Sequence, residues 1–205
     1  MNIIAHRGLW GGSVLGNSLE ALTAAFDQGF DVELDIRDCC GEVVIEHDPP
    51  TGNPLTLQRL FEHAETYDEP PRFYLNIKAD GLAPLLAATI EKFPNCRFTT
   101  FDHSVPDLLR YTEMPFLLRH SEYESAQSLL SIGCPDGVWL DSFEGTRPAK
   151  DAISEIREFW CGEIVVVSDE LHGRDPRSQW LQLPLDDDKL SICTDRVREA
   201  VSQFG

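Results

Sequence analysis

Acidic and apolar residues alternate in the segment 31–36, which reads Asp-Val-Glu-Leu-Asp-Ile. Successive side chains of a β-strand point to opposite faces, so Asp31, Glu33 and Asp35 would share one face of a strand here. Carboxylates that are buried side by side lose their hydration and repel one another, and therefore require a cation among them. A hard divalent metal ion bound through oxygen atoms would meet this need, and salt bridges to arginine or lysine are the alternative. We predict the metal ion.

Further polar residues of suitable types stand at the ends of other predicted strands. Asn76 and Lys78 lie two residues apart, and therefore on one face. An amide oxygen is an acceptable ligand for a hard metal ion, and a lysine beside it can bind a phosphate oxygen. His6 directly follows the first predicted strand, and His47 ends the strand of a predicted hairpin. Two histidines near an acidic metal site suggest a general acid and a general base.

The elements that must position these residues alternate along the whole chain. Short apolar runs predict eight strands, at Asn2–Ala5, Asp31–Ile36, Phe73–Ile77, Arg97–Phe101, Pro115–Leu118, Gly137–Leu140, Glu163–Val167 and Leu190–Cys193. Between most of them the apolar spacing is helical, for example in Ser18–Phe26, Leu82–Phe93, Val105–Tyr111, Tyr123–Ile132 and Ala149–Phe159. This order indicates parallel strands joined by crossover helices.

We predict an α/β protein with a single domain, residues 1–205, folded as a compact (β/α)₈ TIM barrel. A doubly wound open sheet would show the same alternation and is the alternative. The run Glu42–Glu46 follows Cys40-Gly41 and predicts a short β-hairpin after the second strand. Catalytic groups of parallel α/β folds gather at the C-terminal ends of the strands, which is where His6 lies.

Four segments, in order, resemble the signature of the glycerophosphodiester phosphodiesterase family. They are Ile3–Gly8, Asn17–Ala21, Glu33–Asp35 and His47–Pro49. The resemblance extends to the shorter segments 76–78, 100–102 and 192–195, so it covers the chain from end to end. It implies a (β/α)₈ barrel that binds one divalent cation and hydrolyses glycerophosphodiesters.

The resemblance also implies a role for each matching residue. His6 and His47 resemble the acid/base histidines, and Glu33 and Asp35 resemble metal ligands. Arg7 resembles a clamp on the phosphate, and Lys78 falls where the family has a lysine near the phosphate.

Three departures from the family pattern bear on the metal ion and the substrate. Gly16 replaces an acidic residue, and Asn76 stands where the family has a third carboxylate. With Asn76 as a neutral third ligand we predict weak metal binding, with Mg²⁺ preferred over Ca²⁺ because Ca²⁺ sites gain affinity from ligand charge. The family's insert after the His-Asp segment is nearly absent, since 50–54 leads directly into the predicted helix Leu55–Ala64. The sequence therefore does not predict which alcohol groups the substrate carries.

Two arginines further along the chain are candidates for binding an anionic substituent of the substrate. Arg174 lies in a polar loop after the seventh predicted strand, and Arg119 ends the fifth. The alternatives are a solvent-facing charge for Arg174 and a structural pair with Asp141 for Arg119.

Composition limits the partners. With 17 Lys+Arg and 35 Asp+Glu among 205 residues, the formal net charge is −18, which disfavours nucleic acid and anionic membranes as partners. No apolar run approaches the roughly 20 residues of a membrane span. The first residues show no secretory signal, so we expect a cytoplasmic protein with reduced cysteines and a small-molecule phosphodiester substrate. The oligomeric state is not predicted.

Two other functions remain as hypotheses. The short loop after His47 and the polar loop at 168–174 also suit a phosphodiesterase, or a lyase forming a cyclic phosphate, that acts on a sugar- or polysaccharide-linked phosphodiester. The other hypothesis is a non-catalytic barrel that binds phosphodiesters and has lost turnover through Gly16 and Asn76.

Overall fold

The computed structural model describes residues 1–205, in which two compact units are distinguished. Unit 1 contains Met1–Ile4 and Phe116–Gly205, and unit 2 contains Ala5–Pro115. Strand β1 (Asn2–His6) begins in the first unit and ends in the second. Strands and helices alternate in both units, and all eight predicted strands are present.

Unit 2 is built on a mixed sheet. Strands β2 (Asp31–Cys39), β5 (Arg72–Ile77) and β6 (Arg97–Phe101) are parallel neighbours in that order. Strand β3 (Glu42–Ile45) pairs antiparallel with β2, and β4 (Leu55–Thr56) pairs antiparallel with β3. The β2–β3 pair is the predicted hairpin. Its turn residues Cys40 and Gly41 both have positive φ, at 53° and 86°, as the tightest hairpin turns require.

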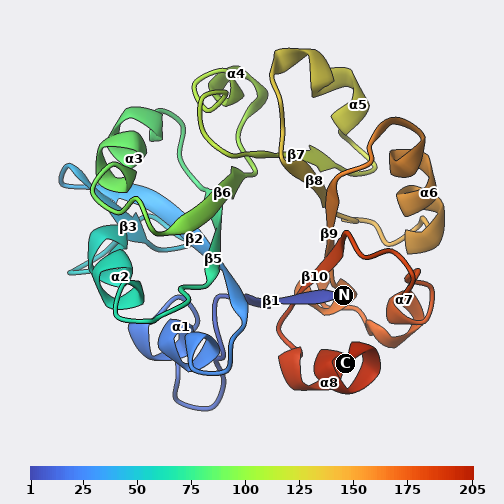
Figure 1. Ribbon diagram of the computed structural model, residues 1–205, viewed down its shortest axis with the longest axis horizontal. Coiled ribbons are helices and arrows are strands. Elements are labelled where there is room, and N and C mark those ends of the chain that lie inside the picture. The colour runs from blue at the N-terminus through green and yellow to red at the C-terminus, as the bar shows by residue number, and fades with distance from the viewer. The chain divides into compact units, whose positions relative to one another are not determined.

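Four helices belong to unit 2: α1 (Leu19–Phe26), α2 (Leu57–Ala64), α3 (Ala83–Ile90) and α4 (Val105–Leu108). Figure 1 shows α1, α2 and α3 on one face of the strands. The side chains of Ser18 and Thr56 accept hydrogen bonds from backbone N–H groups in the first turns of α1 and α2, and so fix where these helices begin. The predicted helix Leu55–Ala64 starts two residues late because Leu55 and Thr56 pair with β3.

Unit 1 contains a parallel sheet in the order β7 (Leu117–His120), β8 (Gly137–Leu140), β9 (Glu163–Val167) and β10 (Leu190–Thr194). Its helices are α5 (Ala126–Leu129), α6 (Ala149–Phe159), α7 (Arg177–Trp180) and α8 (Val197–Phe204), with 3₁₀ turns at η1 (Leu130–Ile132) and η2 (Asp169–His172). They lie on one face of the sheet (Figure 1). The predicted helix Tyr123–Ile132 begins later, at Ala126, because Ser121 N–H closes a turn on the carbonyl of Glu124.

The strands are almost entirely buried. Gly137 shows how closely they pack, because a Cβ atom there would lie 2.7 Å from the carbonyl oxygen of Glu163 on β9. None of the helices has the length and apolar character needed to cross a bilayer.

Candidate active site

A tight loop after β1 brings Arg7 beside the acidic residues of β2. Arg7 has φ of 57° and Gly8 has φ of 83°, so the chain turns sharply away from the strand. A Cβ atom at Gly8 would lie 2.5 Å from the carbonyl of Ala21 on α1, so only glycine fits. The N–H of Arg7 donates to the carbonyl of Glu33 (2.9 Å), which fixes the loop against β2. The sequence thus places an arginine where its side chain can reach the carboxylates.

Asp35 is the centre of this cluster. Its side chain is 1% exposed, with Oδ2 2.8 Å from Arg7 Nε and Oδ1 3.3 Å from Lys78 Nζ. Asn17 Nδ2 also donates a hydrogen bond to Oδ2 (2.9 Å). Burial alone would raise the pKa of Asp35, but Lys78, Arg7 and the hydrogen bond from Asn17 outweigh it and hold that pKa below its ordinary value. Asp35 is therefore ionised and holds two cations at the site.

The pKa of Glu33 is shifted in the opposite direction to that of Asp35. Its carboxyl group is buried, and His6 Nε2 lies 3.7 Å from Oε2. Burial raises the pKa of Glu33 to about 7, and the neighbouring charge of Asp35 adds to this in spite of His6, Lys78 and Arg7. Of these two carboxyl groups on one strand face, Asp35 therefore ionises at a lower pH than Glu33.

Asn76 completes the predicted set of oxygen ligands. It lies opposite Asp35 in the parallel pairing of β5 with β2. Its Oδ1 and the Oε2 of Glu33 are both buried and accept no hydrogen bond. Buried polar atoms without partners are unusual, and unpaired oxygen atoms are the ligands that a hard cation takes. Glu33, Asp35 and Asn76 therefore fit a divalent cation in chemical type, although no group of three His, Cys, Asp or Glu side chains has the arrangement of a metal site.

The two predicted catalytic histidines differ in exposure. The side chain of His6 is 17% exposed, whereas that of His47 is 49% exposed and has Nδ1 2.9 Å from Asp48 Oδ1. His47 is tied to β2 through its backbone, because its carbonyl accepts from Arg37 Nε (2.8 Å). The preceding N–H, of Glu46, donates to the carbonyl of Asp35 (3.0 Å). The hairpin therefore holds His47 close to Asp35, in the middle of β2.

One of the three alternating acids does not belong to the site. Asp31 lies at the start of β2, where its Oδ1 accepts from the backbone N–H of Arg72 (2.8 Å). Asp31 shares a strand face with Glu33 and Asp35, as predicted. Because it lies at the start of the strand, however, its side chain bonds the backbone at the beginning of β5 and not the site.

Two residues of the site have contacts that the sequence analysis did not assign. Asn17 binds Asp35, and Asp102 Oδ2 lies 3.7 Å from Lys78 Nζ. Positive φ is uncommon outside glycine, and the chain has four such residues: Arg7, Asn17, Cys40 and Asp102. All except Cys40 contact Asp35 or its partner Lys78. Strained backbone of this kind tends to gather at functional sites. From the sequence, the position of Asp102 directly after β6 could have indicated that it belongs to the site.

The two arginines predicted to bind substrate belong to unit 1, where each has a carboxylate partner. Arg119 NH2 lies 2.7 Å from Glu124 Oε2, and the guanidinium of Arg174 pairs with Asp169 at the same distance. Arg174 also donates to the carbonyl of Ser142 (2.6 Å). The acid proposed as a structural partner of Arg119, Asp141, binds His172 Nε2 at 2.6 Å. A substrate-binding role for Arg119 and Arg174 remains a prediction.

Known proteins resemble this chain in structure only. No family model and no curated sequence matches it. A glycerophosphodiester phosphodiesterase from Agrobacterium tumefaciens matches with a TM-score of 0.69 at 19% identity, over 99% of this chain and 97% of that one. One from Thermotoga maritima matches with a TM-score of 0.64 at 20% identity, over 98% and 96%. A Galdieria sulphuraria protein, provisionally assigned the same activity, matches with a TM-score of 0.79 at 14% identity, over 99% and 97%.

The chain therefore has the fold of these glycerophosphodiester phosphodiesterases. The predicted fold class, a (β/α)₈ barrel, is confirmed by this likeness over nearly the whole length of both chains.

Proposed function

We propose that the protein is a phosphodiesterase that hydrolyses glycerophosphodiester-type substrates. The observation that supports this most directly is the cluster at Asp35, which holds Arg7 and Lys78 beside the unpaired oxygens of Glu33 and Asn76. A charged phosphodiester needs cations to bind and to stabilise the further charge of its pentacoordinate transition state. Arg7 and Lys78 supply two of them in a chain whose overall charge is strongly negative.

A divalent cation would be held by Glu33, Asp35 and Asn76. When bound, it would neutralise charge on the phosphate oxygens. With two charged ligands and one neutral ligand we propose weak binding in which Mg²⁺ is preferred over Ca²⁺, because Mg²⁺ readily keeps several waters and is completed by substrate phosphate. The raised pKa of Glu33 supports the need for a cation, because the ionised group is disfavoured by burial and its Oε2 accepts no hydrogen bond.

His6 and His47 are the proposed acid/base pair. One would remove the proton from the attacking oxygen, and the other would protonate the leaving alkoxide. His6 Nε2 lies 3.7 Å from the buried carboxyl group of Glu33, and His47 is exposed just after β3. The attacking oxygen is water or a neighbouring hydroxyl of the substrate, and in the second case a cyclic phosphate forms first.

The short chain between His47 and α2 favours one variant of this function. Pro49–Pro54 leads directly from the hairpin into β4 and is largely exposed. Without an insert to enclose the alcohol, a bulkier sugar-linked phosphodiester is the alternative substrate, and a cyclic phosphate the alternative product. We further propose that the enzyme acts in the cytoplasm, in lipid metabolism, on a small molecule and not on nucleic acid.

Turnover of a panel of glycerophosphodiesters tests the proposal. We expect activity that a chelator removes and that His6→Ala and His47→Ala each lower by about 10²-fold or more. His63→Ala, on the outer helix α2, is the matched control and should keep full activity. Unchanged activity in both site variants would overturn the mechanism. Binding of a phosphodiester by calorimetry, with no alcohol released, would instead identify a non-catalytic binding protein.

A further inference from the structure

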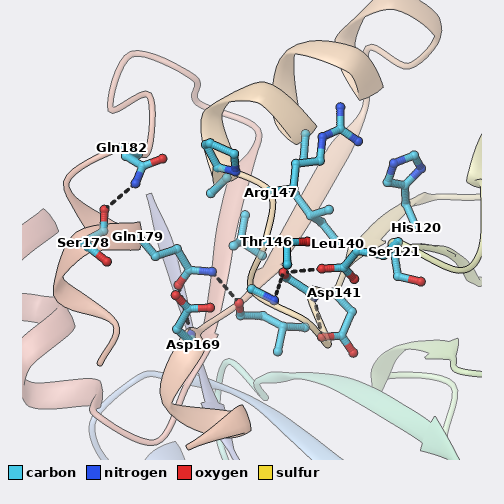
Figure 2. Close-up of a pocket in the computed structure, with 18 residues that line it drawn as sticks. His120, Ser121, Leu140, Asp141, Thr146, Arg147, Asp169, Ser178, Gln179 and Gln182 are labelled. Carbon is cyan, nitrogen blue, oxygen red and sulfur yellow. Dashed lines mark hydrogen bonds between the residues drawn. The ribbon is translucent and has the colours of Figure 1, made fainter. Parts of the chain in front are cut away.

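Unit 1 contains a cavity of about 200 Å³ beside α6, which Figure 2 shows with the residues that line it. Two of these residues, His120 and Gln182, each have a side-chain atom that makes no hydrogen bond, but both atoms are buried and do not open into the cavity. The carboxylates of Asp141 and Asp169, also in the lining, are paired with basic side chains. The lining therefore indicates no particular ligand.

The turn of the β2–β3 hairpin, in unit 2, brings two thiol groups together. Cys39 ends β2 and pairs with Glu42, so Cys40 and Gly41 form the turn. Adjacent side chains of a strand point to opposite faces, but the backbone of Cys40, with φ of 53°, breaks this alternation. The Sγ of Cys39 lies 3.8 Å from the Sγ of Cys40 and donates a hydrogen bond to it. Of the four residues other than glycine with positive φ, Cys40 is the one outside the candidate active site.

Both thiols are free and within reach of solvent. Cys40 is exposed and Cys39 is half-buried. The hydrogen bond to Cys40 raises the pKa of Cys39 above its ordinary value, and burial and the nearby charges of Asp38 and Glu42 add to this. Because the thiolate is the reactive form of cysteine, Cys39 alone is a poor nucleophile at neutral pH. The pair suits an acceptor that takes both sulfurs and removes their protons together.

A disulfide between these neighbouring residues is disfavoured by geometry. Disulfides usually join Cα atoms about 4.4–6.8 Å apart, whereas consecutive Cα atoms are only about 3.8 Å apart. The two sulfurs would also have to close from 3.8 Å to about 2.05 Å. Such a bond stores strain and is readily reduced. We therefore expect Cys39 and Cys40 to remain reduced in a glutathione buffer.

A four-coordinate metal ion also lacks ligands at this turn. Structural Zn²⁺ sites take about four protein ligands. No group of three His, Cys, Asp or Glu side chains is arranged to hold a metal ion, so Asp38 and Glu42 add negative charge near the thiols without completing such a group. The turn thus offers two sulfur ligands and no third, which indicates an acceptor that two sulfurs satisfy.

We propose that Cys39 and Cys40 form a chelating site for a trivalent arsenical that carries one organic group. Trivalent arsenic is a soft acceptor, and thiolates are soft ligands. In the reaction with an arsenic oxide, R–As=O, two As–S bonds form, two S–H bonds break, and the oxygen leaves with both protons as water. Arsenic remains trivalent, so no oxidant or reductant takes part. The carboxylates of Asp38 and Glu42 repel anions, which favours an uncharged acceptor of this kind.

The second As–S bond supplies most of the affinity. Once one sulfur has reacted, the other lies 3.8 Å away and reacts within the same molecule. Linking two contacts in this way raises the overall affinity by about 10²- to 10⁴-fold over that of either alone. Cys134 and Cys161 are also exposed, but each offers a single thiol.

Phenylarsine oxide tests the proposal on the reduced full chain. We expect one phenylarsenic group to add at the turn, by intact mass and peptide mapping, and to survive an excess of glutathione, a monothiol. Dithiothreitol, a dithiol, should remove it. Cys39→Ser and Cys40→Ser should each lower the affinity measured in glutathione by about 10²-fold or more. Cys134→Ser and Cys161→Ser are the matched controls and should bind as the wild type does.

Cys40→Gly is a second variant for the same purpose, because glycine adopts the positive φ of this turn without strain and keeps the hairpin folded. The proposal is overturned if no glutathione-resistant adduct forms on the wild type, or if Cys39→Ser or Cys40→Gly retains it. It is also overturned if the pair closes to a disulfide in the same glutathione buffer, or if Zn²⁺ at equal concentration displaces phenylarsine oxide. None of these outcomes depends on phosphodiesterase activity.

Discussion

Asn76 lies directly across from Asp35 in the pairing of β5 with β2, and its buried Oδ1 accepts no hydrogen bond. An uncharged amide thus faces a carboxylate that already holds Arg7 and Lys78. When Glu33 is ionised as well as Asp35, these two cations balance the two carboxylate charges. A third carboxylate would leave an excess negative charge, which a divalent ion would neutralise. We therefore expect the identity of residue 76 to set the affinity of the proposed metal site.

The first prediction concerns that residue. Asn76→Glu should raise the affinity of the substrate-free protein for Mg²⁺ by about tenfold or more, which corresponds to about 1.4 kcal/mol. The added carboxylate supplies a third charged ligand. Titration with Mg²⁺ in the absence of substrate measures the change, and Asn76→Gln is the neutral control. Equal affinities for Asn76→Glu and the wild type would mean that Asn76 is not a ligand. Tight Ca²⁺ binding by the wild type would contradict the predicted preference.

A second prediction follows from the burial of Asp35. Asp35→Asn should destabilise the protein by about 3 kcal/mol or more, because it leaves Arg7 and Lys78 without the carboxylate that they share. Asp48→Asn removes a carboxylate from an ion pair that is 87% exposed on the aspartate side, and should have little effect. Denaturant unfolding of both variants measures the difference. Similar losses of unfolding free energy in the two variants would show that Asp35 does not stabilise the protein through Arg7 and Lys78.

The raised pKa of Glu33 predicts a pH dependence of stability. Its ordinary value is 4.5 and its value in the folded protein is about 7, so the folded state binds more protons between these limits. The free energy of unfolding contributed by this group is therefore fully present below about pH 4.5 and is lost as the pH rises to 7, by up to about 3 kcal/mol. Unfolding of the wild type and of Glu33→Gln in a chelator across this range measures the contribution.

The difference between the two proteins is the quantity to follow, because His103 acts in the opposite sense. Burial lowers the pKa of His103 from 6.5 to about 3, so its contribution to stability grows as the pH rises through this window. Parallel pH profiles for the wild type and Glu33→Gln would contradict the assignment to Glu33. Addition of Mg²⁺ should reduce the loss in the wild type, because a bound cation favours the ionised carboxyl group.

Two glycines give the fourth prediction. Gly8 and Gly29 both have positive φ, at 83° and 75°, but a Cβ atom would meet the carbonyl of Ala21 at Gly8 and nothing within 4 Å at Gly29. Gly29→Ala should destabilise by about 1 kcal/mol through backbone strain alone. Gly8→Ala should destabilise the protein by at least about 2 kcal/mol more than Gly29→Ala, because of the clash. It should also lower activity, since the loop orients Arg7. Equal losses of stability in the two variants would contradict this reading of the loop.

The fifth prediction separates positioning from binding at Lys78. Asp102→Asn should lower kcat with little change in thermal stability, because Lys78 loses one of two carboxylates that orient its ammonium group. Lys78→Met should lower kcat/KM much further, by about 10²-fold, through loss of a cation in the transition state. Kinetics with a single glycerophosphodiester measure both. A larger effect from Asp102→Asn would assign the more direct role to Asp102.

Sequence periodicity predicted all eight strands of the barrel, because short apolar runs in a parallel sheet are buried on both faces and stand out clearly. The alternation at 31–36 placed Glu33 and Asp35 on one face, as observed. It could not show that Asp31 lies too far along the strand to join them. Arginine and lysine partners were one of the two solutions considered for buried acids, and Asp35 has them; the metal ion remains a prediction.

The roles of Asn17 and Asp102 could not be inferred in the same way. Both contacts depend on backbone with positive φ in loops, and such conformations follow from how a loop packs and not from a repeating pattern. The short helices were also poorly predicted, since α4 and α5 contain only four residues each and α5 passes directly into the 3₁₀ turn η1. The unpaired atoms of His120 and Gln182 have no signature in the sequence at all.

The unequal exposure of His6 and His47 has a kinetic consequence. With about half of its side chain exposed, His47 can exchange protons with bulk solvent and buffer more readily than His6, whose side chain is 17% exposed and lies beside a buried carboxyl group. As the proposed acid/base pair, the two rings would have to return to their starting protonation states in each catalytic cycle. External buffer would therefore accelerate the step in which His47 recovers or releases its proton more than the corresponding step at His6.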